Sequence, residues 1–242
     1  MANIRIQKII ADADICSRRS AETLIKNKRV KVNGKLVSIG ETADPKIEKI
    51  FVDNKSIWRR TEYKAILLNK PKGLISTCFD LQGRKTVLNN IPANDFGRLY
   101  PVGRLDRDSR GAILITNHGE LTLCLTHPSF GHEKTYRVIV KGHPKNDTLE
   151  KWGKRIILDG KITMKSEIHQ IKSNKYNSLL KIKLNEGRNI QIRKIASALG
   201  HPVIDLERIA IGNIQLNKLP EGKWRVLENK EWAHLLQRQY IR

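Results

Sequence analysis

The chain has 242 residues, of which 39% are hydrophobic, so it can bury a core as one large domain or as a small module joined to a medium one. Its 46 Lys and Arg against 24 Asp and Glu leave a formal net charge of +22, and the usual compensation for such a surplus is a polyanionic partner. No apolar run approaches the roughly 20 residues of a membrane span, and no strongly basic amphipathic helix stands out, so a nucleic acid is the expected partner.

Residues 1–60 are predicted to form a small first domain followed by a linker. Apolar residues recur at helical spacing over residues 6–13, and Ser17 is placed to N-cap a second helix. Alternating apolar and basic residues around Asn33-Gly34 predict a hairpin with a tight turn. So many positive charges in a short stretch predict phosphate contacts, with a solvated basic face as the ordinary alternative. The predicted RNA-contacting residues of this part are Arg5, Lys8, Ser17, Arg18, Arg19, Arg29 and Lys31.

Residues 61–242 are predicted to form a larger second domain. Short apolar strands are expected at 113–115, 136–140 and 179–184, and the clearest helix is expected at 189–199, with Gly200 as its stop. Strands outnumber helices and do not alternate regularly with them. The predicted fold class is therefore α+β, with a largely antiparallel sheet in the larger domain.

The segment 103–111 (GRLDRDSRG) precedes a buried strand and places Asp106 between Arg104 and Arg107. Positive neighbours would keep such a carboxylate ionised. Asp108 is an equally good candidate on spacing alone. The ordinary alternative is a turn aspartate in a surface ion-pair cluster.

Two further segments could carry chemistry. In 134–138 (KTYRV) one aromatic, Tyr136, stands among basic residues, which suits base stacking, although a core tyrosine is the ordinary explanation. In 186–194 a glycine-containing turn opens a helix whose backbone N–H groups favour anions. Arg193 could reach inward to a buried carboxylate, or these charges are ordinary helix charges.

The first domain resembles the S4 RNA-binding domain almost throughout. The resemblance rests on the segments 5–8, 16–22 and 29–34. Asp14 stands where the family often has glycine, and an aspartate tolerates positive φ better than most residues. An S4 domain implies binding of structured RNA and is silent about catalysis.

The second domain resembles the pseudouridine synthases, in the branch that modifies ribosomal RNA and carries an N-terminal S4 domain. The matching segments occur in the family's order and are 70–73 (KPKG), 101–106 (PVGRLD), 116–121 (TNHGEL), 134–136 (KTY), 186–193 (EGRNIQIR) and 206–212 (LERIAIG). With the S4 domain, the resemblance covers nearly the whole chain.

The resemblance implies that the chain isomerises one uridine of ribosomal RNA to pseudouridine after flipping the base out of the helix. Asp106 would be the nucleophile and Arg104 would enter the gap left by the base. Tyr136 would stack on the flipped uracil, and Arg193 would pair with Asp106. The further predicted RNA contacts are Lys70, Arg188, Asn189, Gln191 and Lys194. Whether the carboxylate attacks C1′ of the ribose or C6 of the base stays open, as do the ribosomal subunit and the uridine.

No cofactor or metal is expected, because the isomerisation oxidises, phosphorylates and hydrolyses nothing overall. Cys16, Cys78 and Cys124 lack a CxxC spacing and predict reduced thiols in the cytoplasm, and no targeting segment is visible. A monomer is expected, because an RNA-docking face needs no partner subunit.

The main alternative is a non-catalytic ribosomal RNA assembly factor that retains the synthase fold, and the presence of all three candidate catalytic residues argues against it. A zinc deaminase would need an HxE segment and a PCxxC pair, and neither occurs. An S4-bearing aminoacyl-tRNA synthetase would need a nucleotide-handling loop, which the sequence lacks.

Overall fold

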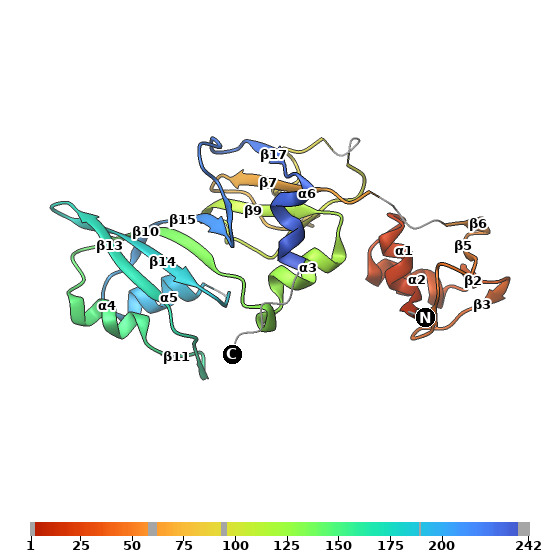
Figure 1. Cartoon of the computed structure of the whole chain (residues 1–242), viewed down its shortest axis with the longest axis horizontal. Helices are drawn as coiled ribbons and strands as arrows, with labels where there is room; N and C mark the ends of the chain where they lie inside the picture. Colours follow the sequence, from red (N-terminus) through yellow and green to blue (C-terminus); the bar gives the residue numbers. More distant parts are fainter. Residues whose placement is uncertain (1–2, 58–61, 93–95, 189, 237–242) are drawn as a thin grey trace. The chain divides into compact units, whose positions relative to one another are not determined.

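The computed structural model describes residues 3–57, 62–92, 96–188 and 190–236. The chain divides into two compact units, Met1–Tyr63 and Lys64–Arg242, each with its own hydrophobic core (Figure 1). No helix in the described ranges combines the length and the hydrophobicity that crossing a bilayer requires.

The first unit packs two helices against two small sheets. Its elements in chain order are β1 (Ile4–Arg5), α1 (Ile6–Asp12), α2 (Arg18–Lys26), β2 (Val30–Val32), β3 (Lys35–Leu36), β4 (Thr42–Ala43), β5 (Ile50–Val52) and β6 (Lys55–Ser56). One sheet has the strand order β3-β2-β5-β6, and the other pairs β1 with β4. The core takes Ile6 and Ile10 from α1, Ala21 and Ile25 from α2, and Val30 from β2.

The local sequence signals of this unit are confirmed. The Ser17 hydroxyl accepts a hydrogen bond from the Ser20 backbone N–H at 3.0 Å and so caps α2. Asn33 and Gly34 have φ of 48° and 83°, as the tight hairpin turn requires. Asp14 has φ 64°, so the aspartate occupies a left-handed position that the S4 family often gives to glycine.

The second unit is built on one large sheet, beside which β11 and β12 form a separate hairpin. Its elements are β7 (Ala65–Lys70), β8 (Tyr100–Val102), β9 (Arg110–Thr116), α3 (Gly119–Thr126), the 3-10 turn η2 (Pro128–Phe130), β10 (Lys134–Lys141), α4 (Asn146–Gly153), β11 (Ile157–Leu158), β12 (Lys161–Ile162), β13 (Glu167–Ser173), β14 (Asn177–Leu184), α5 (Gln191–Ala198), β15 (Val203–Ile211), β16 (Ile214–Gln215), β17 (Trp224–Val226), α6 (Asn229–Trp232) and η3 (Ala233–Leu236). Among the described residues the main strand order is β13-β14-β10-β15-β9-β7-β17. All of these neighbours are antiparallel except β15 and β9, which confirms the predicted α+β class and mainly antiparallel sheet.

Burial along the strands explains their sequences. Every residue of β7 is buried, and so is every residue of β9 after Arg110, as expected for strands covered on both faces. In β14, buried residues alternate with half-buried ones, so a single face enters the core.

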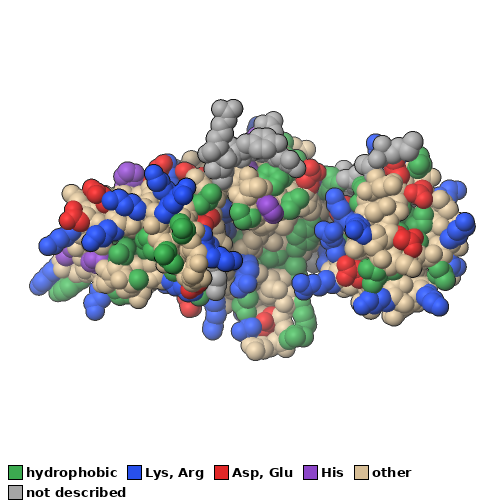
Figure 2. Space-filling view, turned by 90° about the horizontal axis from the view of Figure 1, so that it is seen from below, with side chains coloured by type: hydrophobic (Ala, Val, Ile, Leu, Met, Phe, Trp, Pro, Cys, Tyr) green, Lys and Arg blue, Asp and Glu red, His purple; other side chains and the backbone are tan. Residues whose placement is uncertain are grey.

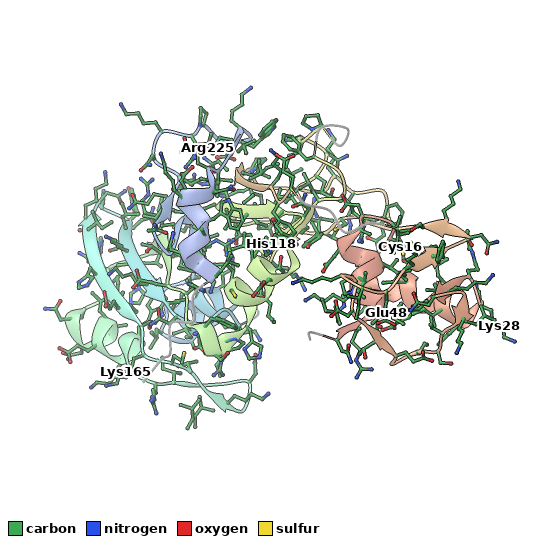
Figure 3. All side chains as sticks on the ribbon, turned by 45° about the vertical axis from the view of Figure 1, so that its right-hand side comes forward. Cys16, Lys28, Glu48, His118, Lys165 and Arg225 are labelled. Carbon is green, nitrogen blue, oxygen red and sulfur yellow. The ribbon has the colours of Figure 1, made fainter. Side chains whose placement is uncertain are left out.

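The helices cover different parts of this sheet. Helix α4 packs against β13 and α5 against β15, whereas α3 packs against β8 and β9 (Figure 1). His118, labelled in Figure 3, lies at the start of α3. Its ring contacts the Trp232 ring edge-on, with 5.5 Å between the ring centroids. The helix expected at 189–199 begins at Gln191 and ends at Ala198.

The parallel junction of β9 and β15 requires a glycine. Gly111 has φ 107°, and a Cβ atom at this position would lie 2.2 Å from the backbone oxygen of Arg208. The two strands can therefore approach only where one of them has no side chain. Residues 103–109 lead directly into β9, so this contact also fixes the distance between that loop and β15.

The close approach can be tested with two alanine substitutions. We expect Gly111→Ala to lower the free energy of unfolding by about 3 kcal/mol or more, because it combines positive φ with a backbone clash. The matched control is Gly160→Ala, which has φ 74° but open space at the Cβ position and should cost about 1 kcal/mol. Urea denaturation measures both values, and equal losses would contradict a steric requirement at Gly111.

Candidate active site

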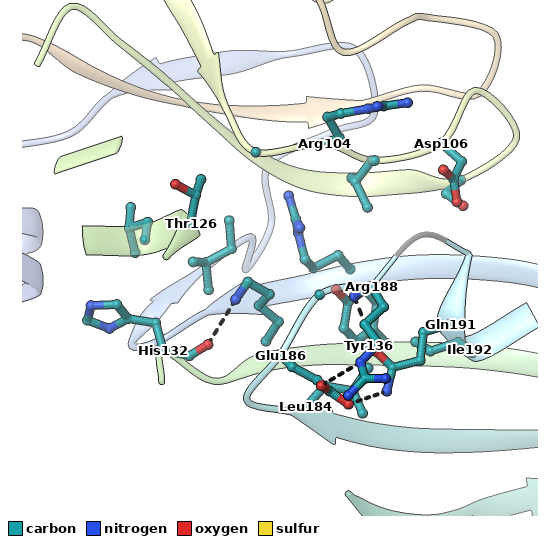
Figure 4. A pocket seen from close by; sticks show the side chains of 18 of the residues that line it. Arg104, Asp106, Thr126, His132, Tyr136, Leu184, Glu186, Arg188, Gln191 and Ile192 are labelled. Carbon is teal, nitrogen blue, oxygen red and sulfur yellow. Dashed lines mark hydrogen bonds and ion pairs between the residues drawn. The ribbon is translucent and has the colours of Figure 1, made fainter. Parts of the chain in front are cut away.

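A pocket of about 470 Å³ opens in the second unit. One wall is the loop of residues 103–109, called the aspartate loop below. The opposite wall is formed by β10, β15 and the turn between β14 and α5. Figure 4 shows Arg104 and Asp106 on the loop and Tyr136 on the facing strand. Arg193 also lines the pocket, so all three predicted catalytic residues and Arg104 meet in one place.

The backbone of the aspartate loop is held on several sides. The Ser109 N–H donates to the Asp106 carbonyl at 3.1 Å and closes a tight turn. The Leu105 N–H donates to the Ser76 hydroxyl at 3.1 Å, and that hydroxyl donates to the Leu105 carbonyl at 2.8 Å. The Gly73 N–H donates to the Arg107 carbonyl at 2.8 Å. The loop is thus a fixed platform for the side chain of Asp106.

Lys70 supports this platform from beneath. Its side chain is fully buried, and its ammonium donates to the carbonyl oxygens of Ser109 at 2.6 Å, Asp106 at 3.1 Å and Pro71 at 3.1 Å. Burial lowers the pKa of Lys70 to about 8, and the negative charges of Asp106 and Asp108 oppose that shift. The prediction that Lys70 contacts RNA is therefore wrong, because its ammonium is enclosed by the backbone of the loop.

Arg193 reaches the same loop at a different atom from the one expected. Its Nη2 donates to the Asp108 carbonyl at 3.0 Å and to the Ser109 hydroxyl at 3.3 Å. Within the part of the chain that the structure describes, Arg193 and Asp106 form no ion pair, and the Asp106 carboxylate has no hydrogen-bond partner. Arg193 thus contacts the turn that carries Asp106, and the predicted direct pair is absent because the guanidinium bonds to the next residues of that turn.

Glu186 organises the turn between β14 and α5, and sequence reasoning did not assign it a role. Its carboxylate accepts hydrogen bonds from Gln191 Nε2 at 2.8 Å, the Met164 N–H at 2.9 Å and Arg188 Nε at 3.0 Å. Arg188 also donates to the carbonyl oxygens of Lys161 and Ile162, and so ties this turn to the β11–β12 hairpin.

Four predicted RNA contacts fall in this segment. Gln191 is buried against Glu186, and Arg188 is largely occupied within the turn. Lys194 pairs with Asp159 at 2.6 Å on the surface. Asn189 lies outside the described residues. The RNA contacts of these residues stay predictions.

Two cations beside Tyr136 were also not predicted as site residues. Lys134 and Arg208 both line the pocket, and Arg208 is the cross-strand partner of Tyr136. Burial and the charge of Arg208 lower the pKa of Lys134 to about 8. Side chains two residues apart on a strand project from the same face, so the sequence itself indicates that Lys134 lies beside Tyr136.

In the first unit, some of the predicted RNA-contacting side chains bond to other groups of the protein and others are exposed. Arg29 forms a two-pronged ion pair with Asp53, with both N···O distances at 2.6 Å, and Lys31 donates to Asn54 at 3.1 Å. Arg5 donates to the Gly40 carbonyl. The remaining members are Lys8, which is half-buried, the α2 cap Ser17, and Arg18 and Arg19, which are exposed at the start of α2. Figure 2 shows Lys and Arg side chains spread over the visible face of each unit.

The described residues contain no group of three or more His, Cys, Asp or Glu side chains that could hold a metal ion. Cys16, Cys78 and Cys124 all lie in the described ranges, and none of them forms a disulfide.

Comparisons with known proteins match both units. Residues 64–198 match the family model described as RNA pseudouridylate synthase, and residues 4–45 match the S4 domain. The chain is 40% identical over 236 residues to ribosomal large subunit pseudouridine synthase B of Bacillus subtilis, covering 96% of this chain and 95% of the relative. It is 37% identical over 245 residues to an RNA pseudouridine synthase of Aquifex aeolicus, covering 97% and 94%. A crystal structure of a pseudouridylate synthase matches with a TM-score of 0.69 and 28% identity, over 96% of this chain and 99% of that one.

The buried ammonium of Lys70 makes stability depend on pH in a defined window. Because its pKa falls from 10.5 to about 8 on folding, the unfolded chain binds more protons between these values, and this residue makes stability rise with pH there. Lys70→Met lacks this titration. We therefore expect the difference in unfolding free energy between wild type and Lys70→Met to grow by about 2 kcal/mol from pH 8 to pH 10. Urea denaturation across that range measures it, and the exposed Lys85→Met controls for the loss of one charge. A constant difference would show that Lys70 does not titrate in this window.

Proposed function

Because the chain belongs to the RNA pseudouridylate synthase family, we propose that it isomerises one uridine of ribosomal RNA to pseudouridine with Asp106 as the nucleophile. The observation that carries the proposal is the pocket itself. It presents an Asp106 carboxylate, without a partner among the described residues, on a fixed loop opposite Tyr136. Large-subunit RNA is the first substrate to test, since the Bacillus subtilis relative is named for the large subunit.

The reaction needs few functional groups, and the pocket supplies them. The N1–C1′ bond of uridine breaks, the uracil turns, C5 bonds to C1′, and the C5 hydrogen leaves as a proton. A single ionised carboxylate can act as the covalent catalyst. A carboxylate fixed on a rigid loop can attack without first reorganising its surroundings, which lowers the barrier to the covalent step.

The base must leave the RNA helix to enter this pocket, at a cost of about a few kcal/mol. The ring of Tyr136 is 7% exposed and lines the pocket, so it offers a stacking surface for one base. Arg104 is exposed on the aspartate loop and is the residue that would enter the gap in the helix. Stacking and insertion together offset the cost of extruding the base.

Arg193 acts in this proposal as a positioning residue. Its contacts go to the Asp108 carbonyl and the Ser109 hydroxyl, and so it sets the orientation of the turn that carries Asp106. Lys70 holds the same turn through the carbonyl oxygens of Asp106 and Ser109. The two cations would keep the carboxylate aimed into the pocket while RNA binds and leaves.

The S4 unit would contribute affinity through phosphate contacts. Arg18 and Arg19 are the best candidates, because both are exposed at the start of α2. Contacts of this kind release counterions, so binding should weaken as salt rises.

The nucleophile assignment is tested by single-turnover conversion of transcribed large- and small-subunit ribosomal RNA carrying tritium at C5 of uridine. We expect Asp106→Asn to slow tritium release by at least about 10⁴-fold, because the amide cannot form the covalent bond. RNA affinity should stay within about threefold of wild type.

Asp108→Asn is the matched control, since it lies on the same turn and is exposed. It should keep most of the activity. If Asp108→Asn abolishes tritium release and Asp106→Asn does not, the nucleophile is misassigned. If wild type binds both RNAs tightly and releases no tritium from either, the chain is a binding protein.

The role of the S4 unit is tested by the double substitution Arg18→Ala and Arg19→Ala. We expect RNA affinity at about 0.1 M salt to fall about tenfold, and the slope of log K against log salt to become shallower by about 2. Filter binding across a salt series measures both quantities. The control is Lys46→Ala with Lys49→Ala, which removes two exposed charges of the same unit outside the predicted contact set. Equal effects of the two pairs would show that only net charge matters.

A further inference from the structure

Two positive side chains in the strand wall of the pocket, Lys134 on β10 and Arg208 on β15, have no negative partner among the described residues. Lys134 donates to the His132 carbonyl at 3.0 Å, and Arg208 Nε donates to the Ala112 carbonyl at 2.7 Å. Neither forms an ion pair with a carboxylate within the described ranges. Buried cations in proteins are normally paired with anions, because an unpaired charge is costly to remove from water.

Arg208 is the more unusual of the two. The residue is 4% exposed, and its Nη2 atom is buried without a hydrogen-bond partner. An unsatisfied guanidinium nitrogen in a folded core requires an explanation. Since Arg208 lines the pocket, an anion that enters the pocket would supply the missing negative charge.

The strands place these cations beside Tyr136. Lys134 and Tyr136 lie two residues apart on β10 and so project from the same face of the sheet. Arg208 on β15 is the direct cross-strand partner of Tyr136. Residues in such positions have Cβ atoms about 5 Å apart. A base stacked on the ring of Tyr136 therefore lies next to both positive charges, with Asp106 on the opposite wall.

We propose that Lys134 and Arg208 stabilise the negative charge that develops on the uracil ring during the isomerisation. This inference rests on the proposed function and extends it. It gives two residues outside the predicted catalytic set the role of stabilising the negative charge of the base. It applies to either site of attack by Asp106.

Both routes of attack make the uracil ring negatively charged. When a carboxylate oxygen of Asp106 bonds to C1′, the N1–C1′ bond breaks and its electron pair passes to the uracil, where N1, O2 and O4 share the charge. When the oxygen bonds to C6 instead, the electrons of the C5=C6 bond move into the ring and place the charge on O4. On the first route C5 of the uracil anion then displaces the Asp106 oxygen from C1′. On the second route the N1–C1′ bond breaks after the addition, C5 bonds to C1′, and the Asp106 oxygen leaves C6. On both routes the C5 hydrogen leaves as a proton and the carboxylate is restored. Positive charge that the protein holds in place stabilises such an anion without the reorganisation that water needs.

The proposal predicts a pH dependence with a defined sign. Lys134 faces Arg208 from β15 and the ring of His132 on its own segment, and both would oppose a further positive charge when protonated. Since its pKa lies at about 8, Lys134 loses its charge as pH rises through that value. The rate of the covalent steps should therefore fall above about pH 8. An arginine at the same position keeps its charge throughout this range.

The test compares Lys134→Met, Lys134→Arg and the control Lys141→Met, which removes an exposed lysine from the same strand. Single-turnover tritium release is measured with the C5-labelled ribosomal RNA transcripts, from pH 6 to pH 10, at saturating protein. We expect Lys134→Met to slow the reaction about 10²-fold at pH 7 while RNA affinity changes less than about threefold. Lys134→Arg should retain the rate at pH 7 within about fivefold and show a smaller decline above pH 8 than wild type. Part of the decline should remain, because Lys70 beneath the aspartate loop also loses its charge near pH 8. Lys141→Met should match wild type.

The outcomes separate this inference from the proposed function. If wild type releases tritium and Lys134→Met releases it equally fast, the charge-stabilising role is wrong and the proposed function stands. If Lys134→Arg is as slow as Lys134→Met at pH 7, or if its decline above pH 8 is as large as that of wild type, the role is also wrong, because a guanidinium supplies the same charge and keeps it throughout this range. If wild type releases no tritium from any transcript, the proposed function fails and this inference fails with it.

Arg208→Met is a second variant, and circular dichroism checks that it folds. A folded Arg208→Met protein with the wild-type rate would overturn the role assigned to Arg208.

Discussion

The geometry of the site depends on one buried contact, between the ammonium of Lys70 and the carbonyl oxygens of the aspartate loop. Consecutive carbonyl groups that point inward repel one another and would normally turn toward water. A single cation beneath them satisfies several at once, with distances of 2.6 Å to Ser109 and 3.1 Å to Asp106. The loop held in this way carries Asp106, whose side chain lines the pocket.

The second constraint is the place where the sheet changes from antiparallel to parallel. Gly111 lets β9 approach the backbone of Arg208, so the loop that carries Asp106 and the strand that carries Arg208 are fixed to each other by main-chain contact. Arg208 in turn faces Tyr136 across the next pair of strands. Asp106, the ring of Tyr136 and the guanidinium of Arg208 are therefore positioned by three adjacent strands of one sheet.

Much of this could be predicted from the sequence, where local rules decide the outcome. The cap at Ser17, the turn at Asn33-Gly34 and the α+β class follow from local pattern alone. The convergence of Asp106, Tyr136 and Arg193 came from resemblance to a family, because spacing within one segment cannot show that distant segments meet. Lys70 was misjudged for a physical reason. A lysine between an apolar strand and a proline-glycine loop fits a surface contact as well as a buried one, and only the fold shows which carbonyl groups it meets.

The arrangement of Arg193 also bears on how a carboxylate can be both held and reactive. A guanidinium bonded directly to the Asp106 oxygens would draw electron density from the atoms that must attack carbon, and the bond would have to weaken during the reaction. Contacts to the Asp108 carbonyl and the Ser109 hydroxyl fix the same turn while leaving those oxygens free. The positive charge of Arg193 still acts through space, since both residues line one pocket. In the proposed mechanism two tasks are thus separate: Arg193 and Lys70 would orient Asp106, and Lys134 and Arg208 on the opposite wall would stabilise the negative charge of the base.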